Sequence, residues 1–266
     1  MSWTLFKRNV KSDYFLWLVI LFILSFYMLS IASMFDPEKQ NSLNDMMNLL
    51  PPGMMEALGF STTGTTLLTF IMGFIYGTLI FMFPPLYPAI SNNRLVARHV
   101  DRGSMAYLLS SPNSRIQIVF TQAVFSVVST TALIVGITAI GILECQLLSP
   151  GQLEIGNFIM INIYLLFLFW TISGISFCAS CLFNDTRHST AVGVGLPYAF
   201  LLFKILGNTG EQMKWIGKMS LYNLFSPDKF LAGDDFVIYA SIILVSLAFA
   251  LYISGIMIFN KKDLPL

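Results

Sequence analysis

The chain carries little charge. Only 11% of its 266 residues are Asp, Glu, Lys or Arg, whereas a soluble domain carries about 25%. Apolar residues make up 56%, more than a soluble fold of this length can bury, so the composition indicates an integral membrane protein and excludes a disordered chain. The net charge of +1 supplies no basic field for a polyanion, and we expect no nucleic-acid partner.

Cysteine and histidine are scarce. Three cysteines cannot build a closed disulfide framework. Cys178 and Cys181 form a C-x-x-C inside an apolar run, where we interpret them as small packing residues rather than metal ligands. The two histidines, His99 and His188, are far apart, and no His-Glu-x-x-His occurs. No metal site is therefore expected, and neither metal-assisted hydrolysis nor intramembrane proteolysis has the groups it needs.

The sequence also lacks a nucleotide-binding loop and a proton relay. Gly217 and Lys218 have no glycine at the required upstream position, since residue 212 is Gln, so no P-loop is formed. No acid lies near the centre of an apolar run, where a relay would need one. We expect no catalytic residue and no cofactor in this chain.

Long apolar runs are what the sequence does contain. A spanning helix needs about 20 mostly apolar residues. Six segments qualify, at roughly 14–34, 65–90, 115–143, 155–183, 189–206 and 236–259. The predicted fold class is all-α integral membrane, with residues 1–266 as a single transmembrane domain. The first run has a flank that resembles a signal peptide, but its length favours a retained span.

Lys and Arg are unevenly divided between the two sides of the predicted membrane domain. Ten lie at the two chain ends, between the second and third runs and in the turn between the fourth and fifth; five lie on the opposite side. The positive-inside rule therefore places both termini in the cytosol.

The first thirteen residues have an amphipathic pattern. Trp3, Phe6 and Val10 fall on one helical face, while Lys7 and Arg8 lie mostly off it. This pattern predicts a short elbow helix that lies on the inner leaflet and contacts membrane lipid. The alternative is an ordinary basic flank of the first span.

Two outer segments also carry apolar residues. Segment 35–64 is predicted to form two short amphipathic pieces separated by prolines. Segment 207–235 has the composition either of a re-entrant piece buried in protein or of an interfacial loop with aromatic anchors. Lys204, at the edge of the fifth run, is expected to extend toward the membrane surface. Contact with a substrate is the alternative.

Small residues recur at intervals of four in two of the runs. They are Thr69, Gly73 and Gly77 in the second run, and Ser246, Ala250 and Ser254 in the last. Such spacing lets helix backbones approach closely, either within the chain or between subunits. Three prolines at positions 84, 85 and 88 are expected to break the inner end of the second run.

The segment between the second and third runs begins with a charged helical pattern. Arg94, Arg98, Asp101 and Arg102 recur at helical spacing. Gly103 can end that helix in a left-handed cap. A short helix followed by a turn is therefore predicted on the cytosolic side.

A second short helix is predicted directly after this turn. Met105, Leu108 and Leu109 form an apolar stripe that spanning does not require. We expect the stripe to be available to a protein partner; the alternative is that it packs on the inner ends of this chain's own helices. Ser114 with Gln117 three residues later forms a capping-box pattern that begins the third span.

The stretch from Asp101 to Arg115, DRGSMAYLLSSPNSR, resembles the Glu-x-Gly-Thr…Leu-Leu…Pro-x-Ser-Arg stretch of type-2 ABC exporter permeases. Asp, Ser and Asn stand where that family has Glu, Thr and Ile. The ending from Phe259 to Leu264 is similar to the family's F-x-x-[RK]-D-[LI] ending. Six spans and a basic N-terminal flank agree with the same family.

The resemblance implies a permease subunit of an ATP-driven exporter. Its coupling helix would dock on a separate ABC ATPase, which holds the ATP and Mg, through Arg94, Arg98, Asp101, Arg102, Gly103, Met105, Tyr107, Leu108 and Leu109. It implies two permease subunits, expected to be identical, with two ATPases in a bacterial cytoplasmic membrane.

The substrate expectation is an amphipathic peptide or toxin, because the chain is most similar in kind to peptide exporter permeases such as those for phenol-soluble modulins. Export of a lipid or a hydrophobic drug is the second expectation. A non-transporting immunity or sensor protein is the alternative from another class.

The charge bias leads to a direct test of topology. In a cysteine-free background, a cysteine at Lys262 should be shielded from an impermeant maleimide applied to intact cells, whereas one at Ser149 should react. Labelling at 262 together with protection at 149 would reverse the orientation.

Overall fold

The computed structural model describes residues 1–35, 66–109, 114–209 and 211–262, and every regular element within them is helical. The predicted outer pieces at 35–64 lie almost entirely outside the described residues. The elements are α1 (Trp3–Met34), α4 (Leu67–Ile71), the π-helix η1 (Met72–Leu79), α5 (Ile80–Met82), α6 (Leu86–Leu95), α7 (Ala97–Asp101), α8 (Met105–Leu109), α9 (Arg115–Leu148), α10 (Ile155–Leu182), α11 (Thr186–Asn208), the 3₁₀ turn η2 (Glu211–Met213), α12 (Lys214–Lys218), the 3₁₀ turn η3 (Leu221–Leu224), α13 (Pro227–Leu231) and α14 (Phe236–Lys261).

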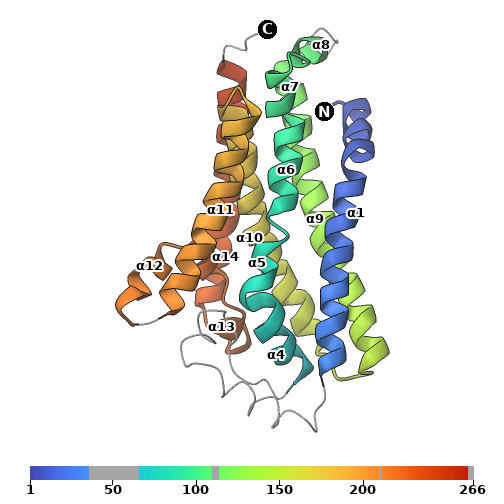
Figure 1. Ribbon diagram of the computed structural model, residues 1–266, viewed down its shortest axis with the longest axis vertical. Helices are drawn as coiled ribbons and strands as arrows, with labels where there is room; N and C mark the ends of the chain where they lie inside the picture. The colour runs from blue at the N-terminus through green and yellow to red at the C-terminus, as the bar shows by residue number, and fades with distance from the viewer. Residues whose placement is uncertain (36–65, 110–113, 210, 263–266) are drawn as a thin grey trace.

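Six helical stretches are long and apolar enough to cross a membrane. They are Trp3–Met34, Leu67–Asp101, Arg115–Leu148, Ile155–Leu182, Thr186–Asn208 and Phe236–Lys261. Each corresponds to one of the six predicted runs, so the prediction of an all-α multi-pass membrane protein is confirmed. Figure 1 shows these helices side by side, with both chain ends at the same end of the molecule, as an even number of crossings requires.

Helix α10 lies at the centre and packs against α6, α9, α11 and α14. Two glycines let α10 and α14 approach closely. A methyl group at Gly174 would lie 3.1 Å from the Cβ of Leu251, and one at Gly255 would lie 3.0 Å from the Phe177 ring. Because apolar packing gives no advantage over lipid contact, such close backbone approach is a main source of helix association in membranes.

The predicted small-residue stripe on α14 is not the contact with α10. Ser246 and Ala250 are exposed, and the hydroxyls of Ser246 and Ser254 donate to carbonyls of their own helix. The buried face of α14 is formed by Ala240, Leu244, Ala248, Tyr252, Gly255 and Phe259. The prediction that this stripe forms a contact within the chain is therefore wrong. That it contacts a second subunit stays a prediction.

The second span is interrupted twice. The π-helix η1 follows α4, and its i→i+5 bonding takes residues four apart out of line. Thr69 is engaged in a capping box with Thr66, so the predicted line of Thr69, Gly73 and Gly77 is not a continuous packing stripe. Prolines separate α5 from α6, which confirms the predicted break.

The N-terminal stretch is not a separate elbow helix. Residues Trp3–Met34 form one helix, because no proline or glycine interrupts them. Phe6 packs edge-on against Phe125, with ring centroids 5.5 Å apart, while Trp3 and Val10 are exposed. Of the predicted apolar face, Phe6 therefore packs on the protein, whereas Trp3 and Val10 point outward. Lipid contact of this stretch stays a prediction.

Part of the outer segment 207–235 packs against the bundle, whereas Met213, Trp215 and Met219 are exposed. Tyr222 and Phe225 are buried in the core, where the Tyr222 ring centroid lies 4.7 Å from that of Phe81. Helices α11 and α12 cross at two glycines, and a methyl group on Gly207 would lie 2.4 Å from the Cα of Gly217. Burial in protein is the condition that a re-entrant piece requires; its depth in a membrane stays a prediction.

The glycine crossing can be tested with two alanine substitutions in one helix. Gly207→Ala must displace the α12 backbone and should lower the free energy of unfolding by about 1–3 kcal/mol. Gly195→Ala is the matched control, because its methyl group meets nothing within 4 Å, and it should raise helix stability by up to about 1 kcal/mol. Thermal unfolding of the purified chain in detergent measures both. Equal melting temperatures for the two variants would show that α11 and α12 do not cross closely.

Candidate functional site

The segment from α7 to α8, Ala97–Leu109, is called the elbow below. It is distinct from the N-terminal elbow helix that was predicted over the first thirteen residues. Gly103 has a φ of 66°, so it forms the predicted left-handed turn between the two short helices. Ser114 and Gln117 form the predicted capping box at the start of α9. In Figure 1 the elbow lies at the same end of the molecule as both termini. The two short helices and the turn between them lie where the sequence predicts them, and the role of this segment as a coupling helix stays a prediction.

The apolar side of the elbow does not face outward. Met105 is only 1% exposed, and Leu108 is partly buried against the same group. This inner cluster consists of Leu95, Val96, Val100, Met105, Val119, Ala123, Phe125, Phe177, Cys181, Tyr252 and Phe259. The left-handed turn at Gly103 directs α8 back onto the bundle, so the prediction that Met105 and Leu108 are available to a partner is wrong. The side chain of Leu109 lies outside the described residues.

Other elbow residues form the outer surface. The side chain of Tyr107 is 82% exposed, and Arg102 is also exposed. Asp101 is exposed too and accepts a hydrogen bond of 2.6 Å from the Thr186 hydroxyl at the start of α11. Arg94 and Arg98 are half-buried, and the Arg94 guanidinium lies 3.7 Å from the Asp13 carboxylate of α1. A partner would therefore meet Arg102 and Tyr107 before Met105 or Leu108.

Three consecutive polar residues of α6 connect the elbow to three spanning helices. We call Ser91, Asn92 and Asn93 the polar hub. The Ser91 hydroxyl donates to Asp13 in α1. The Asn92 amide donates to the carbonyl oxygen of Ser173 in α10, at 3.0 Å.

The third member of the polar hub reaches another helix. The Asn93 amide donates to the Thr186 carbonyl at 3.1 Å and to the Thr190 hydroxyl at 2.7 Å, both in α11. Successive helical residues point about 100° apart, so three neighbours in sequence can reach three different helices. All three hub residues are buried. A displacement of α6 must therefore move these partners or break buried hydrogen bonds.

A second group of polar side chains, next to the polar hub, joins α9, α10 and α14. The Ser126 hydroxyl of α9 lies 2.8 Å from that of Ser173 in α10 and 2.9 Å from the Tyr252 hydroxyl of α14. Tyr252 is also 2.8 Å from Ser173. Ser173 thus belongs to both groups, and α6, α9, α10 and α14 share one continuous hydrogen-bond network.

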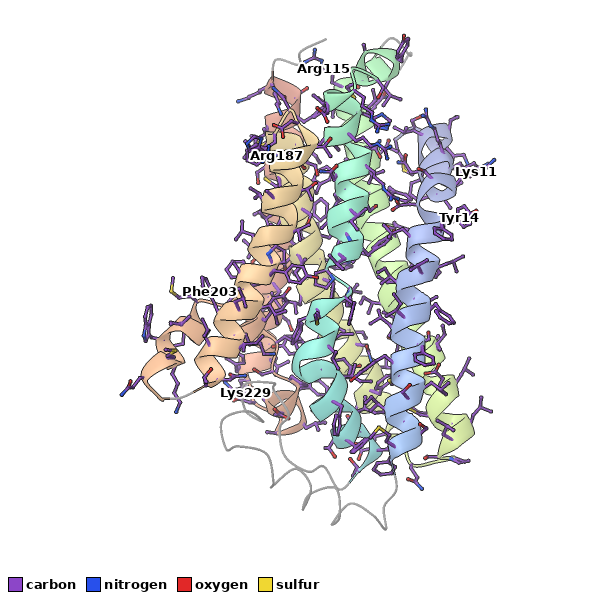
Figure 2. All side chains as sticks on the ribbon, in the orientation of Figure 1. Lys11, Tyr14, Arg115, Arg187, Phe203 and Lys229 are labelled. Atoms are coloured by element: carbon purple, nitrogen blue, oxygen red, sulfur yellow. The ribbon has the colours of Figure 1, made fainter. Side chains whose placement is uncertain are left out.

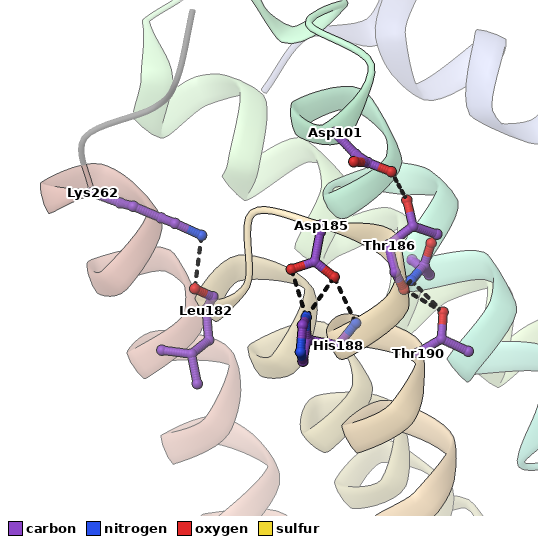
Figure 3. Close-up of polar contacts among 8 residues, drawn as sticks. Asp101, Leu182, Asp185, Thr186, His188, Thr190 and Lys262 are labelled. Carbon is purple, nitrogen blue, oxygen red and sulfur yellow. Dashed lines mark hydrogen bonds and ion pairs between the residues drawn. The ribbon is translucent and has the colours of Figure 1, made fainter.

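The C-terminal motif ties α14 to the α10–α11 turn. Phe259 is buried in the inner cluster, and the Lys262 amine donates to the carbonyls of Cys181 at 3.1 Å and Leu182 at 2.7 Å. Lysine thereby satisfies carbonyls that the end of α10 leaves open. Burial lowers the pKa of Lys262 from its ordinary value. Figure 3 shows the Lys262–Leu182 hydrogen bond beside the start of α11.

Asp185 caps the start of α11 on the other side of this turn. Its carboxylate accepts a hydrogen bond of 2.7 Å from the His188 backbone N–H and lies 2.8 Å from the His188 ring nitrogen (Figure 3). These hydrogen bonds, the backbone one first, hold the pKa of Asp185 below its ordinary value. Asp185 therefore caps the first turn of α11, and Thr186 in that turn donates to Asp101 of the elbow.

Lys204 points into the protein. Its amine donates to the Gly77 carbonyl at 3.3 Å and lies 4.0 Å from the Phe81 ring centroid. Gly77 belongs to the π-helix η1, where altered bonding leaves carbonyls for other donors. The expectation that Lys204 extends to the membrane surface is wrong, because an internal carbonyl and an aromatic face are closer partners.

Sequence reasoning missed the polar hub and its partner Asp13. The usable signal was Ser-Asn-Asn within a helical stretch, directly after the prolines and before the charged residues. Buried polar side chains in a membrane segment require partners. Among the described residues, no group of three or more His, Cys, Asp or Glu is placed to hold a metal ion.

Comparison with known families identifies the family of this chain. The model of the ABC-2 family transporter proteins matches residues 2–264 of this chain. The chain therefore belongs to the ABC-2 transporter family and is a transmembrane component of an ABC transporter, a role that implies a partner ABC ATPase subunit. No curated protein matches the chain.

The polar hub can be tested by removing one amide. Asn92→Ala removes two hydrogen bonds to Ser173 from a fully buried position. We expect the free energy of unfolding to fall by about 1–2 kcal/mol. Asn157→Ala is the control, since the Asn157 side chain is exposed and bonds only locally to Glu154. Unfolding by SDS titration measures the difference, and equal stability of the two variants would contradict a structural role for Asn92.

Proposed function

We propose that this chain is the permease subunit of an ABC exporter and that the elbow is its contact with the ATPase. The observation that carries the proposal is the connection of the elbow, through the polar hub of α6, to three spanning helices. The family match supplies the transporter class. Membership of this family does not bring ATP hydrolysis into the chain itself, so the energy comes from the partner.

The elbow is suited to transmit force because it is packed as part of the bundle. Met105 is buried beside Val100, and both contact the inner cluster that includes residues of α9, α10 and α14. Close-packed groups move together rather than deform. ATP binding closes the two ATPases and pushes the elbow, and the polar hub carries the displacement to α1, α10 and α11.

The substrate proposed first is an amphipathic peptide or toxin, with lipid or hydrophobic drug second. An apolar cavity among α1, η1, α5, α9 and α10 supports an apolar ligand, and its lining includes Tyr27, Tyr76 and Phe158. The cavity volume is about 30 Å³, which holds no peptide, so transport requires the helices to separate from this arrangement.

The assembly proposed is a pair of identical permease subunits with two ATPases in a bacterial cytoplasmic membrane, both termini cytosolic. The exposed Ser246 and Ala250 on α14 support a second subunit, since small residues allow close contact between helices. The shared end of the termini and the elbow supports an ATPase contact on that side.

The ATPase contact can be tested with matched aromatic-to-aspartate substitutions. Tyr107→Asp places a charge on the exposed elbow surface and should abolish co-purification of the co-expressed ABC ATPase, because exposed aromatic residues dominate small interfaces. Trp215→Asp is the control: Trp215 is 63% exposed but lies in α12, outside the spanning helices and away from the elbow (Figure 1). Both variants should insert normally. Retained ATPase in Tyr107→Asp preparations, or equal loss in both variants, would contradict the assigned contact.

An ATP hydrolysis assay distinguishes the role of the permease from that of the ATPase. The permease purified alone should hydrolyse no ATP above an empty-vector preparation, and the co-purified complex should do so. Robust hydrolysis by the isolated chain would refute the proposal.

A further inference from the structure

A polar cavity of about 300 Å³ lies between the start of α1 and the α6–α7 segment. This volume has room for many water molecules or for a phosphate group with its substituents. The cavity shares Arg102 with the exposed surface of the elbow, and Tyr107 is not among its lining residues. Its lining includes Arg8, Asn9, Asp13, Arg94, Arg98 and Arg102.

The cavity lining is strongly basic. It contains four arginines and one acid among the residues that the structure describes. That acid, Asp13, is already engaged, because it lies 3.7 Å from Arg94 and accepts the Ser91 hydroxyl. The lining therefore offers no further acid to Arg8, Arg98 or Arg102. Guanidinium groups bind phosphate through two parallel hydrogen bonds, so several arginines that line one cavity favour a phosphate ligand.

The position of the cavity along α1 favours a lipid as the source of that phosphate. Tyr14 and Phe15 are exposed and begin the apolar outer face of α1. Arg8 lies about 9 Å before Tyr14 at the helical rise of 1.5 Å per residue. Headgroups occupy a layer about 5–8 Å thick on each side of the hydrocarbon core, so Arg8 lies near the outer edge of that layer. Figure 2 shows Lys11 and Tyr14 on the side of α1 that points away from the bundle.

The two walls of the cavity belong to different parts of the chain. Arg8 comes from α1, whereas Arg98 and Arg102 come from the elbow region. A bound anion between them would neutralise charge that otherwise repels across the cavity. It would thereby hold the start of α1 against the elbow.

We propose that this cavity binds the phosphate of an anionic lipid headgroup, such as a phosphatidylglycerol, in the leaflet next to the elbow. Basic pockets between spanning helices on the cytosolic side suit such headgroups. The site requires the arginines that line the cavity rather than general positive charge. The inference does not depend on the transported substrate or on ATPase binding.

The experiment uses the full chain purified in an uncharged detergent and native mass spectrometry to count bound lipids. Phosphatidylglycerol, zwitterionic phosphatidylcholine and inorganic phosphate are added separately. We expect phosphatidylglycerol to bind the unaltered chain and its apparent affinity to fall at least about tenfold in the Arg8→Gln, Arg98→Gln variant. The matched control is Lys11→Gln, Lys261→Gln, which removes two exposed basic charges outside the cavity lining and should change the affinity less than twofold.

Each result decides the proposal. Strong phosphatidylglycerol binding with weak binding of the other two ligands supports a lipid headgroup site, and equal binding of inorganic phosphate keeps the anion site but overturns the lipid source. Equal loss in the arginine variant and the lysine control, with both variants folded by their melting temperatures, would overturn the site. So would phosphatidylglycerol binding unchanged in an arginine variant that loses its ATPase, because the cavity would then be a protein contact.

Discussion

The arrangement of this protein depends on satisfying buried polar side chains of one short helix. In a membrane, an unpaired amide or hydroxyl has no water to bond, so a partner within the protein stabilises it. The hydroxyl of Ser91 and the amide nitrogens of Asn92 and Asn93 donate to α1, α10 and α11 respectively, whereas the Asn92 Oδ1 is buried without a partner. Because hydrogen bonds are directional whereas apolar contacts are not, these three residues determine how α6 is rotated and how deeply it lies. The elbow continues from α6, so its position follows from the same bonds.

The two ends of the bundle differ in how tightly they are held. At the elbow end, the inner cluster, the polar hub and the caps at Asp185 and Lys262 join all six spanning helices into one packed body. Toward the other end, the second span passes through prolines and a π-helix, and the Lys204 amine donates to the Gly77 carbonyl. Regular packing suits transmission of a displacement, whereas interrupted helices offer points where the backbone can rearrange. A permease needs both properties, one next to the ATPase and one along the transport path.

Much of this fold was predictable because its signals are local. Apolar runs longer than a membrane core predicted six spans, and Gly103 and the Ser114–Gln117 pair predicted a turn and a helix start that depend on a few adjacent residues. The elbow was therefore located from sequence. Its orientation was not: Met105 and Leu108, assigned to the partner surface, belong to the inner cluster, and the first thirteen residues continue into α1.

The number of spans, the shared end of the termini and the place of the elbow are properties of the sequence alone, since they follow from hydropathy and from residues that act within one or two helical turns. Which face of each helix packs inward was decided only by the tertiary structure. Lipid is as apolar as a protein interior, so an apolar pattern in a spanning helix does not distinguish the two. Hydrogen-bond partners determine which face of a helix packs inward. These partners lie far apart in sequence: Ser91 reaches Asp13, 78 residues away, and Asn92 reaches Ser173, 81 residues away. Only folding brings such pairs together, which is why the polar hub and the basic cavity beside it emerged from the structure and not from the motifs.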